Sequence, residues 1–192
     1  VAQHAANLRQ LGIQDVMLGW TLGGYPSPNL DVVAEVMQAP AGEPSVMVEH
    51  ALAAVAERRF GPKLSPAVVQ AWRAYSIAFQ EFPYHASVVY SAPLQNGPSN
   101  LLWTTPTGYR ASMVGLPYDD LDQWRGPYPA DVFAAQLEKV AEGFDSASRV
   151  LTAVTRPEPG RAGHPLTTGE VALMGEIRVA EAAAIHWRSV AN

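Results

Sequence analysis

The chain contains no cysteine among its 192 residues. Disulfide bonds and thiolate metal sites are therefore excluded, and cysteine usage gives no information on the redox compartment. The five histidines lack the short, regular spacing that metal-binding histidines show; they are His4, His50, His85, His164 and His186. The sequence therefore indicates no metal site.

The common catalytic and nucleotide-binding motifs are also missing. There is no Gly-x-Ser-x-Gly elbow, no Walker A loop and no dinucleotide-binding fingerprint. The closest glycine cluster, Gly19-x-x-x-Gly23-Gly24, matches no phosphate-binding pattern. The sequence therefore indicates no cofactor and assigns no catalytic residue.

Basic residues and long apolar runs are scarce. The chain has 13 Lys and Arg against 18 Asp and Glu, a net charge of -5, which argues against a nucleic-acid or acidic-membrane partner. No apolar run approaches the length of a membrane span, and no signal-peptide pattern is present. We expect a soluble protein without nucleic-acid or membrane partners, with the cytoplasm as the favoured compartment.

The most distinctive stretch that is present covers residues 19–29. It holds three glycines, two prolines and the aromatic residues Trp20 and Tyr25, and it follows a predicted strand over residues 13–18. A strand that ends in a rigid aromatic loop and leads into a helix is a common way for α/β enzymes to build one edge of a site. A packed turn with both rings in the core is the alternative interpretation.

Helical periodicity dominates the rest of the chain. Helices are predicted to begin at Asn29, Ser45 and Ser65, each a residue with capping ability. The third carries an aromatic face that we interpret as core, made of Trp72, Tyr75, Phe79 and Phe82. The pattern predicts a mainly α fold.

Residues 84–129 are the least regular part. The segment 84–90 is compatible with a short helix or a strand, and residues 118–125 predict one or two helical turns. Loops of this length are usually functional or disordered, and the density of aromatic and apolar residues argues against disorder. We expect an ordered, packed segment.

Two long helices are predicted to close the chain. The first carries apolar residues at alternating steps of four and three, the spacing of a helix-packing seam: Phe133, Leu137, Val140, Phe144, Ala147, Leu151 and Val154. The second begins at a capping box from Thr167 to Glu170. Because a short connection joins them, we expect the two helices to pack antiparallel in a helical bundle with long ordered loops.

The pattern at the start of the chain predicts that residues 1–30 do not belong to the helical domain. A helical pattern at Val1 leads into a single strand, and the rest of the sequence offers few strands to pair with it. We therefore expect the C-terminal piece of a longer protein, with residues 1–30 as the remnant of the last βα unit of a truncated (β/α) barrel. Residues 31–192 would form an α-helical domain.

An acidic and aromatic cluster lies in the irregular part. Carboxylates beside aromatic rings suit sugar chemistry, although no calcium-loop spacing is present. The alternative is structural: Asp119 or Asp120 caps the short helix, and Arg125 pairs with a neighbour. The cluster comprises Tyr118, Asp119, Asp120, Asp122, Trp124 and Arg125.

Residues 18–27 resemble the end of the last barrel strand in large bacterial glycoside-hydrolase-like proteins. Residues 72–83 are similar to a helix of the α-helical region that follows the barrel, and residues 97–103 and 115–121 are similar to parts of the same region. The resemblance implies a TIM-barrel hydrolase with its catalytic residues mostly on upstream strands. It also implies that Trp20 and Tyr25 lie at the C-terminal mouth of the barrel.

The sequence leaves three alternative functions for the chain. The first is the C-terminal, mainly helical part of a carbohydrate-active glycoside hydrolase, without the main catalytic carboxylates and inactive in isolation. Its partners would be a carbohydrate substrate and the rest of the parent chain. The alternatives are a non-enzymatic helical interaction or scaffold module, and a stand-alone hydrolase that uses the acidic cluster. The predicted substrate-binding residues are Trp20, Tyr25, Tyr118, Asp119, Asp120 and Trp124.

Overall fold

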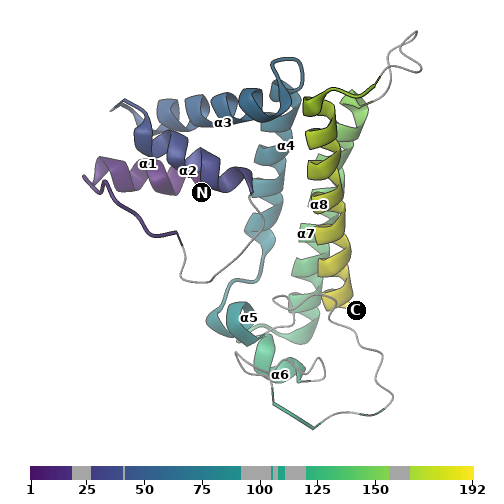
Figure 1. The fold of residues 1–192 in the computed structure, drawn as a ribbon. Helices are drawn as coiled ribbons and strands as arrows, with labels where there is room; N and C mark the ends of the chain where they lie inside the picture. The colour runs from purple at the N-terminus through teal and green to yellow at the C-terminus, as the bar shows by residue number, and fades with distance from the viewer. Residues whose placement is uncertain (19–26, 41, 92–104, 106–107, 111–119, 156–164) are drawn as a thin grey trace. The chain divides into compact units, whose positions relative to one another are not determined.

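The structure is a computed structural model, and it is mainly helical, as the sequence predicts. It divides into two compact units (Figure 1). Unit 1 consists of residues 1–69 and 165–172, and unit 2 consists of residues 70–164 and 173–192. The residues that the structure describes are 1–18, 27–40, 42–91, 105, 108–110, 120–155 and 165–192.

Unit 1 is built around three helices: α1 (Ala2–Gln10), α2 (Pro28–Gln38) and α3 (Pro44–Phe60). Each of them contacts the other two (Figure 1). Their buried faces carry mostly alanine and valine, which lets the helix axes come close together. The buried side chains of these helices are Ala2, Ala5, Ala6, Val32, Val33, Val36, Met47, Ala51, Val55, Ala56 and Phe60.

Proline sets the start of the helices in unit 1. Pro28 and Pro44 occupy the first positions of α2 and α3, where a missing backbone N–H costs nothing and a fixed φ is already helical. The predicted caps Asn29 and Ser45 therefore lie inside their helices, and both helices begin earlier than predicted. The third helix begins at Ser65, the residue predicted as its cap, one position earlier than predicted.

Residues 13–18 form neither helix nor strand. No other described residue lies in a strand either, so this segment has no strand to pair with in that part of the chain. A β-strand is defined by its backbone hydrogen bonds to a neighbour, and an apolar pattern alone cannot supply them. The predicted βα unit is therefore not formed within the described residues.

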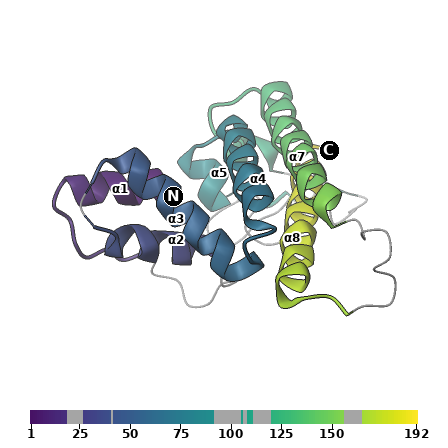
Figure 2. The same ribbon diagram turned by 90° about the horizontal axis from the view of Figure 1, so that it is seen from above.

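Unit 2 is a bundle of long helices (Figure 2). It contains most of α4 (Ser65–Ala78), the 3₁₀ turn η1 (Phe79–Glu81), α7 (Ala130–Val154) and most of α8 (Thr168–Ala191). The predicted antiparallel arrangement of the last two helices is confirmed. Phe133 near the start of α7 shares a core cluster with Val190, and Phe144 further along α7 packs against Trp187.

The predicted seam of α7 is buried over most of its length. Val154, its last member, is exposed. The predicted seam thus identifies the buried face of α7 up to its last turn, where the side chain of Val154 is exposed. The seam residues that are fully or almost fully buried are Phe133, Leu137, Val140, Ala147 and Leu151.

The capping box at the start of α8 is confirmed. Glu170 accepts the Thr167 backbone N–H at 2.7 Å, and the Thr167 hydroxyl accepts the Glu170 backbone N–H at 3.2 Å. Two of the helix's unpaired donors are satisfied reciprocally. Within unit 1, Gly169 in this first turn lies so close to the end of α3 that an added Cβ would be 2.2 Å from the Phe60 carbonyl oxygen.

Two short helices complete unit 2: α5 (Ala86–Ser91) and α6 (Leu121–Trp124). They contact each other (Figure 1). The segment for which the sequence left helix and strand open thus contains a helix, and the predicted helical turns at 118–125 include α6.

The two compact units differ from the predicted division of the chain at residues 30 and 31. That division falls within α2 of unit 1. The assignment of residues 1–30 to a barrel remnant and of residues 31–192 to a helical domain stays a prediction.

Candidate functional site

Four of the six predicted substrate-binding residues lie outside the described residues: Trp20, Tyr25, Tyr118 and Asp119. The other two, Asp120 and Trp124, lie at opposite ends of α6. Their assignment to carbohydrate binding stays a prediction, and the structure gives the surroundings of the last two.

Trp124 belongs to the core of unit 2. It is 5% exposed, and its ring meets the ring of Phe133 edge-on with centroids 5.6 Å apart. Val88, Leu137 and Val190 complete the same buried cluster. Trp124 therefore anchors α6 to α5, α7 and α8. A buried indole N–H normally finds an acceptor, but Trp124 Nε1 has none among the described residues.

Asp120 occupies the N-cap position of α6. Its backbone carbonyl accepts the N–H groups of Gln123 and Trp124, at 3.1 and 3.4 Å, but its side chain makes no capping hydrogen bond to the helix. Asp120 thus takes the predicted cap position without a side-chain hydrogen bond to the helix, and Asp119, the other predicted cap, lies outside the described residues. The predicted pairing of Arg125 with a neighbour is confirmed, since its Nη2 lies 2.5 Å from Asp122 Oδ1.

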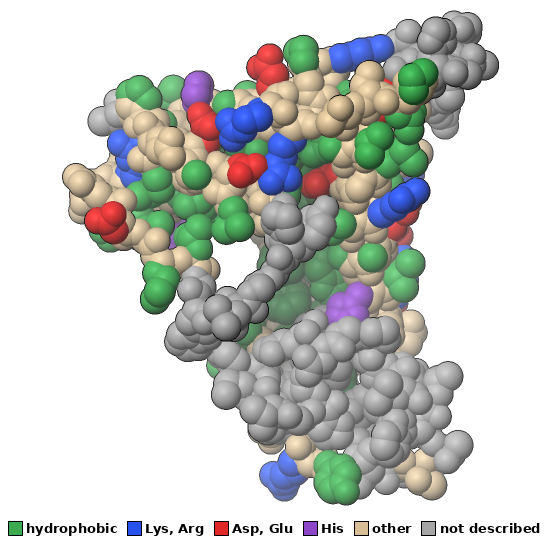
Figure 3. Space-filling model, in the orientation of Figure 1, with side chains coloured by type: hydrophobic (Ala, Val, Ile, Leu, Met, Phe, Trp, Pro, Cys, Tyr) green, Lys and Arg blue, Asp and Glu red, His purple; other side chains and the backbone are tan. Residues whose placement is uncertain are grey.

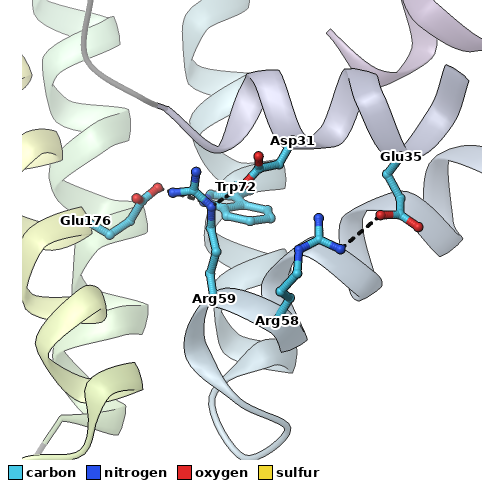
Figure 4. Close-up of polar contacts among 6 residues, drawn as sticks. All are labelled: Asp31, Glu35, Arg58, Arg59, Trp72 and Glu176. Carbon is cyan, nitrogen blue, oxygen red and sulfur yellow. Dashed lines mark hydrogen bonds and ion pairs between the residues drawn. The ribbon is translucent and has the colours of Figure 1, made fainter. Parts of the chain in front are cut away.

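Sequence reasoning missed a polar contact between α4 and α8. Trp72 Nε1 donates to Glu176 Oε1 at 2.7 Å (Figure 4). Trp72 belongs to the aromatic face that the sequence assigns to the core, and its indole is in fact half-buried with its polar edge on a carboxylate. No local pattern could have paired these residues, because 104 positions separate them.

A second polar contact joins α4 to α7. The Tyr75 hydroxyl and the Ser148 hydroxyl are 3.0 Å apart. Burial raises the pKa of the Tyr75 phenol, and the nearby carboxylates of Glu176 and Glu181 raise it further, whereas the Ser148 contact lowers it. Tyr75 is thus a neutral hydrogen-bonding group over the ordinary pH range.

The remaining rings of the aromatic face form a chain across unit 2. Tyr75 packs on Phe144 with ring centroids 4.7 Å apart, and Phe144 meets Trp187 edge-on at 4.3 Å. Phe79 stacks on Phe82 at 4.9 Å and reaches Trp187 at 6.0 Å. The interpretation of this face as core is only partly right, because Trp72, Tyr75 and Phe82 are half-buried and Phe79 is 48% exposed.

Unit 1 is held by ion pairs between α2 and α3. Arg58 lies 3.0 Å from Glu35, and Arg59 lies 2.6 Å from Asp31 (Figure 4). Basic and acidic side chains lie next to one another over these helices in Figure 3. Exposed pairs of this kind contribute about 0–1 kcal/mol each. We read them as structural contacts.

Neither a metal site nor a membrane span is found in the described part of the chain. No group of three or more acidic or histidine side chains there could hold a metal ion. No described helix has the length and apolarity needed to cross a membrane.

Comparison with known proteins gives no match. No family model, no curated protein and no solved structure matches the chain.

Proposed function

We propose that this chain is the C-terminal, mainly helical part of a carbohydrate-active glycoside hydrolase. Residues 13–18 form a barrel strand when they pair with strands from the rest of the parent protein, and the loop that follows lines the mouth of the barrel. Trp20 and Tyr25 bind sugar there, and Tyr118, Asp119 and Asp120 are further proposed substrate contacts. The main catalytic carboxylates lie elsewhere in the parent protein.

The observation that carries the proposal is the exposure of residues 13–18. Met17 is 84% exposed and Leu18 is 58% exposed, and Ile13 is also exposed. Burying such side chains contributes about 1.5–3 kcal/mol each. An apolar segment that lacks both burial and strand pairing in the described residues is suited to enter a sheet supplied by another part of the protein.

The two faces of this segment favour a parallel sheet. Ile13, Asp15 and Met17 fall on one face of an extended chain, and Gln14, Val16 and Leu18 fall on the other, so each face carries two apolar residues. Strands with apolar residues on both faces are typical of parallel sheets covered by helices, as in (β/α) barrels. The order strand, glycine-rich loop, helix α2 also agrees with a βα unit.

The test is glycan binding and hydrolysis by the full-length product of the gene that encodes this chain. We expect binding on a glycan array and cleavage of the bound glycan. Trp20→Ala and Tyr25→Ala should each weaken binding by about two- to tenfold, since a well-placed aromatic face contributes roughly 0.5–1.5 kcal/mol. Tyr109→Ala, at an exposed tyrosine that is not among the predicted substrate-binding residues, is the control. Absence of both binding and cleavage across the array would overturn the proposal.

A second candidate is a helical interaction module. Exposed apolar side chains on α4 and η1, Ile77 and Phe79, favour it because such residues are typical of protein-binding surfaces. The same experiment separates the two functions. An interaction module binds no glycan, and its Trp20→Ala variant behaves as the unchanged protein does on the array.

A further inference from the structure

We propose that one side of α8 is the interface of a homodimer, in which two copies of the chain pack their α8 helices antiparallel about a two-fold axis. The interface is formed by Met174, Arg178, Glu181 and Ile185, which we call the α8 stripe. All four residues belong to unit 2. The partner is a second copy of this chain, and the dimer does not depend on glycan binding.

The α8 stripe gives the helix a second apolar side in addition to the one that is already buried. Leu173, Ala180 and Ala184 form the buried side of α8. On the stripe, Met174 is 37% exposed and Ile185 is 67% exposed. A surface helix normally presents polar side chains to solvent. Large apolar side chains on both sides of α8 therefore favour a partner on the solvent side.

The spacing of the α8 stripe is that of a helix–helix contact. Its residues follow one another at steps of four, three and four along the sequence, which is the spacing of a coiled-coil seam on one face of a helix. Neighbouring Cβ atoms in such a stripe are about 5–6 Å apart. With a rise of about 1.5 Å per residue, the four side chains form one continuous surface about 16 Å long.

The order of side chains in the stripe fits its own reverse. Arg178 and Glu181 lie between the two apolar residues. In a symmetric dimer, residue i contacts residue j of the other copy and j contacts i. An antiparallel pairing centred between positions 179 and 180 therefore sets Met174 against Ile185 of the second copy. It also sets Arg178 against Glu181 of the second copy, once on each side of the axis.

The two charges select the antiparallel arrangement and are available for it. A parallel pairing would place Arg178 against Arg178 and Glu181 against Glu181, and like charges in contact disfavour association. Both side chains are exposed, and neither forms an ion pair with another described residue. Arg188 of the same helix, by contrast, pairs with Asp145 of α7. The antiparallel dimer thus gives each stripe charge an opposite charge.

Small residues beside the stripe leave room for a second helix. Gly175 and Ala182 are seven positions apart, so they lie on nearly the same line along α8. An added Cβ on Gly175 would meet nothing within 4 Å, and Ala182 is exposed. The distance between two packed helices depends on the side chains at their contact. The second helix can therefore approach α8 closely on this side of the stripe.

The size of the stripe sets the strength of the dimer. A single helix face of this length buries less than the about 1,200 Å² of total surface at which standard interfaces begin. We therefore expect a weak dimer with a Kd on the order of 100 μM. At the low-micromolar concentrations used for circular dichroism, the chain is then a monomer.

The test is the molecular mass of the protein by sedimentation equilibrium from about 10 μM to about 1 mM, a range that brackets this Kd. We expect a rise from the mass of the monomer to that of the dimer. Arg178→Glu and Glu181→Arg should each raise the Kd about tenfold or more, because each sets like charges against each other twice. The double variant exchanges the two charges and should return to within about threefold of the unchanged protein.

Mixing the two single variants tests the antiparallel register. In a mixed dimer, the Arg178→Glu copy presents two acidic side chains to the two basic side chains of the Glu181→Arg copy, so both pairs are attractive. We expect mixed dimers at concentrations at which neither variant dimerises alone. A mixture that associates no more than the separate variants would overturn the proposal.

Two variants outside the stripe serve as matched controls. Arg110→Glu makes the same charge change at an exposed arginine outside α8. Ile77→Ser is the control for Ile185→Ser, since Ile77 on α4 is 66% exposed. Ile185→Ser should raise the Kd about tenfold, and both controls should stay within about twofold. A protein that is monomeric at about 1 mM, or a dimer that the controls weaken as much as the stripe variants do, would refute the α8 interface.

Discussion

Trp72 on α4 and Glu176 on α8 are joined by a hydrogen bond of 2.7 Å between the indole Nε1 and a carboxylate oxygen. Both side chains are half-buried. A hydrogen bond to an ionised carboxylate is stronger than one between neutral groups, and its loss leaves a partly desolvated charge without a donor. This contact connects the two helices above the aromatic rings of unit 2.

Trp72→Phe should lower the free energy of unfolding by about 1–3 kcal/mol, because it removes the donor to Glu176 and part of a large side chain. The measurement is urea denaturation followed by circular dichroism at pH 7. Glu181→Gln, at an exposed position on the same helix, should change the free energy of unfolding by no more than about 0.5 kcal/mol. Equal stabilities for these two variants would contradict the assigned role of the Trp72 contact.

The contact between Gly143 of α7 and Ala78 of α4 gives a prediction with a built-in control. A Cβ on Gly143 would lie 2.4 Å from the Ala78 Cβ and 3.3 Å from its Cα. Gly143→Ala should therefore destabilise the protein by about 1–3 kcal/mol, although alanine is the better helix former. In α8, a Cβ on Gly175 would meet nothing within 4 Å, so Gly175→Ala should stabilise by roughly 0.5–1 kcal/mol.

Thermal and urea unfolding of the two glycine variants check this prediction. Opposite signs are expected for the two variants. The double variant Gly143→Ala with Ala78→Gly should recover part of the loss, because it removes the opposing methyl group. A stabilised Gly143→Ala protein would show that α4 and α7 do not approach each other as described.

The raised pKa of Tyr75 predicts a loss of stability at high pH. Burial is the main cause of the shift. The folded state therefore binds the phenolic proton more tightly than the unfolded state, whose tyrosines ionise near pH 10. The stabilising contribution is complete below that pH and is lost as the pH rises through the folded-state pKa.

Urea denaturation from pH 8 to pH 11 measures this effect as a difference between the unchanged protein and Tyr75→Phe. At pH 8 the variant should be less stable by about 0.5–1.5 kcal/mol, since it lacks the bond to Ser148. Above pH 10 the difference should shrink or change sign. Parallel stability curves across the whole range would refute the assignment of the shift to Tyr75.

Much of the fold could be predicted from the sequence because its signals are local. The Thr167–Glu170 capping box and the α7 seam depend only on residue spacing along one helix, and both are confirmed. The helix starts at Pro28 and Pro44 were missed, although proline at the first helical position was a usable signal. Spacing along the chain also sufficed for the antiparallel order of α7 and α8.

The candidate site was less predictable. Trp124 and Asp120 were chosen together because they lie in one acidic and aromatic cluster, but the structure places the Trp124 ring in a core and leaves Asp120 at the helix start. Sequence proximity gives no information on which side of a four-residue helix faces the protein interior.

The sequence by itself determined most of the helical segments, the capping box of α8 and which face of α7 is buried. Those properties follow from backbone capping and from the 3.6-residue period. The tertiary structure decided the rest: the Trp72–Glu176 bond, the close approach of Gly143 to Ala78, the exposed setting of Met174 and Ile185, and the lack of a strand at residues 13–18 in the described chain. Each of these depends on groups far apart in sequence, and hydrogen bonds and steric contacts exist only when folding brings both partners together.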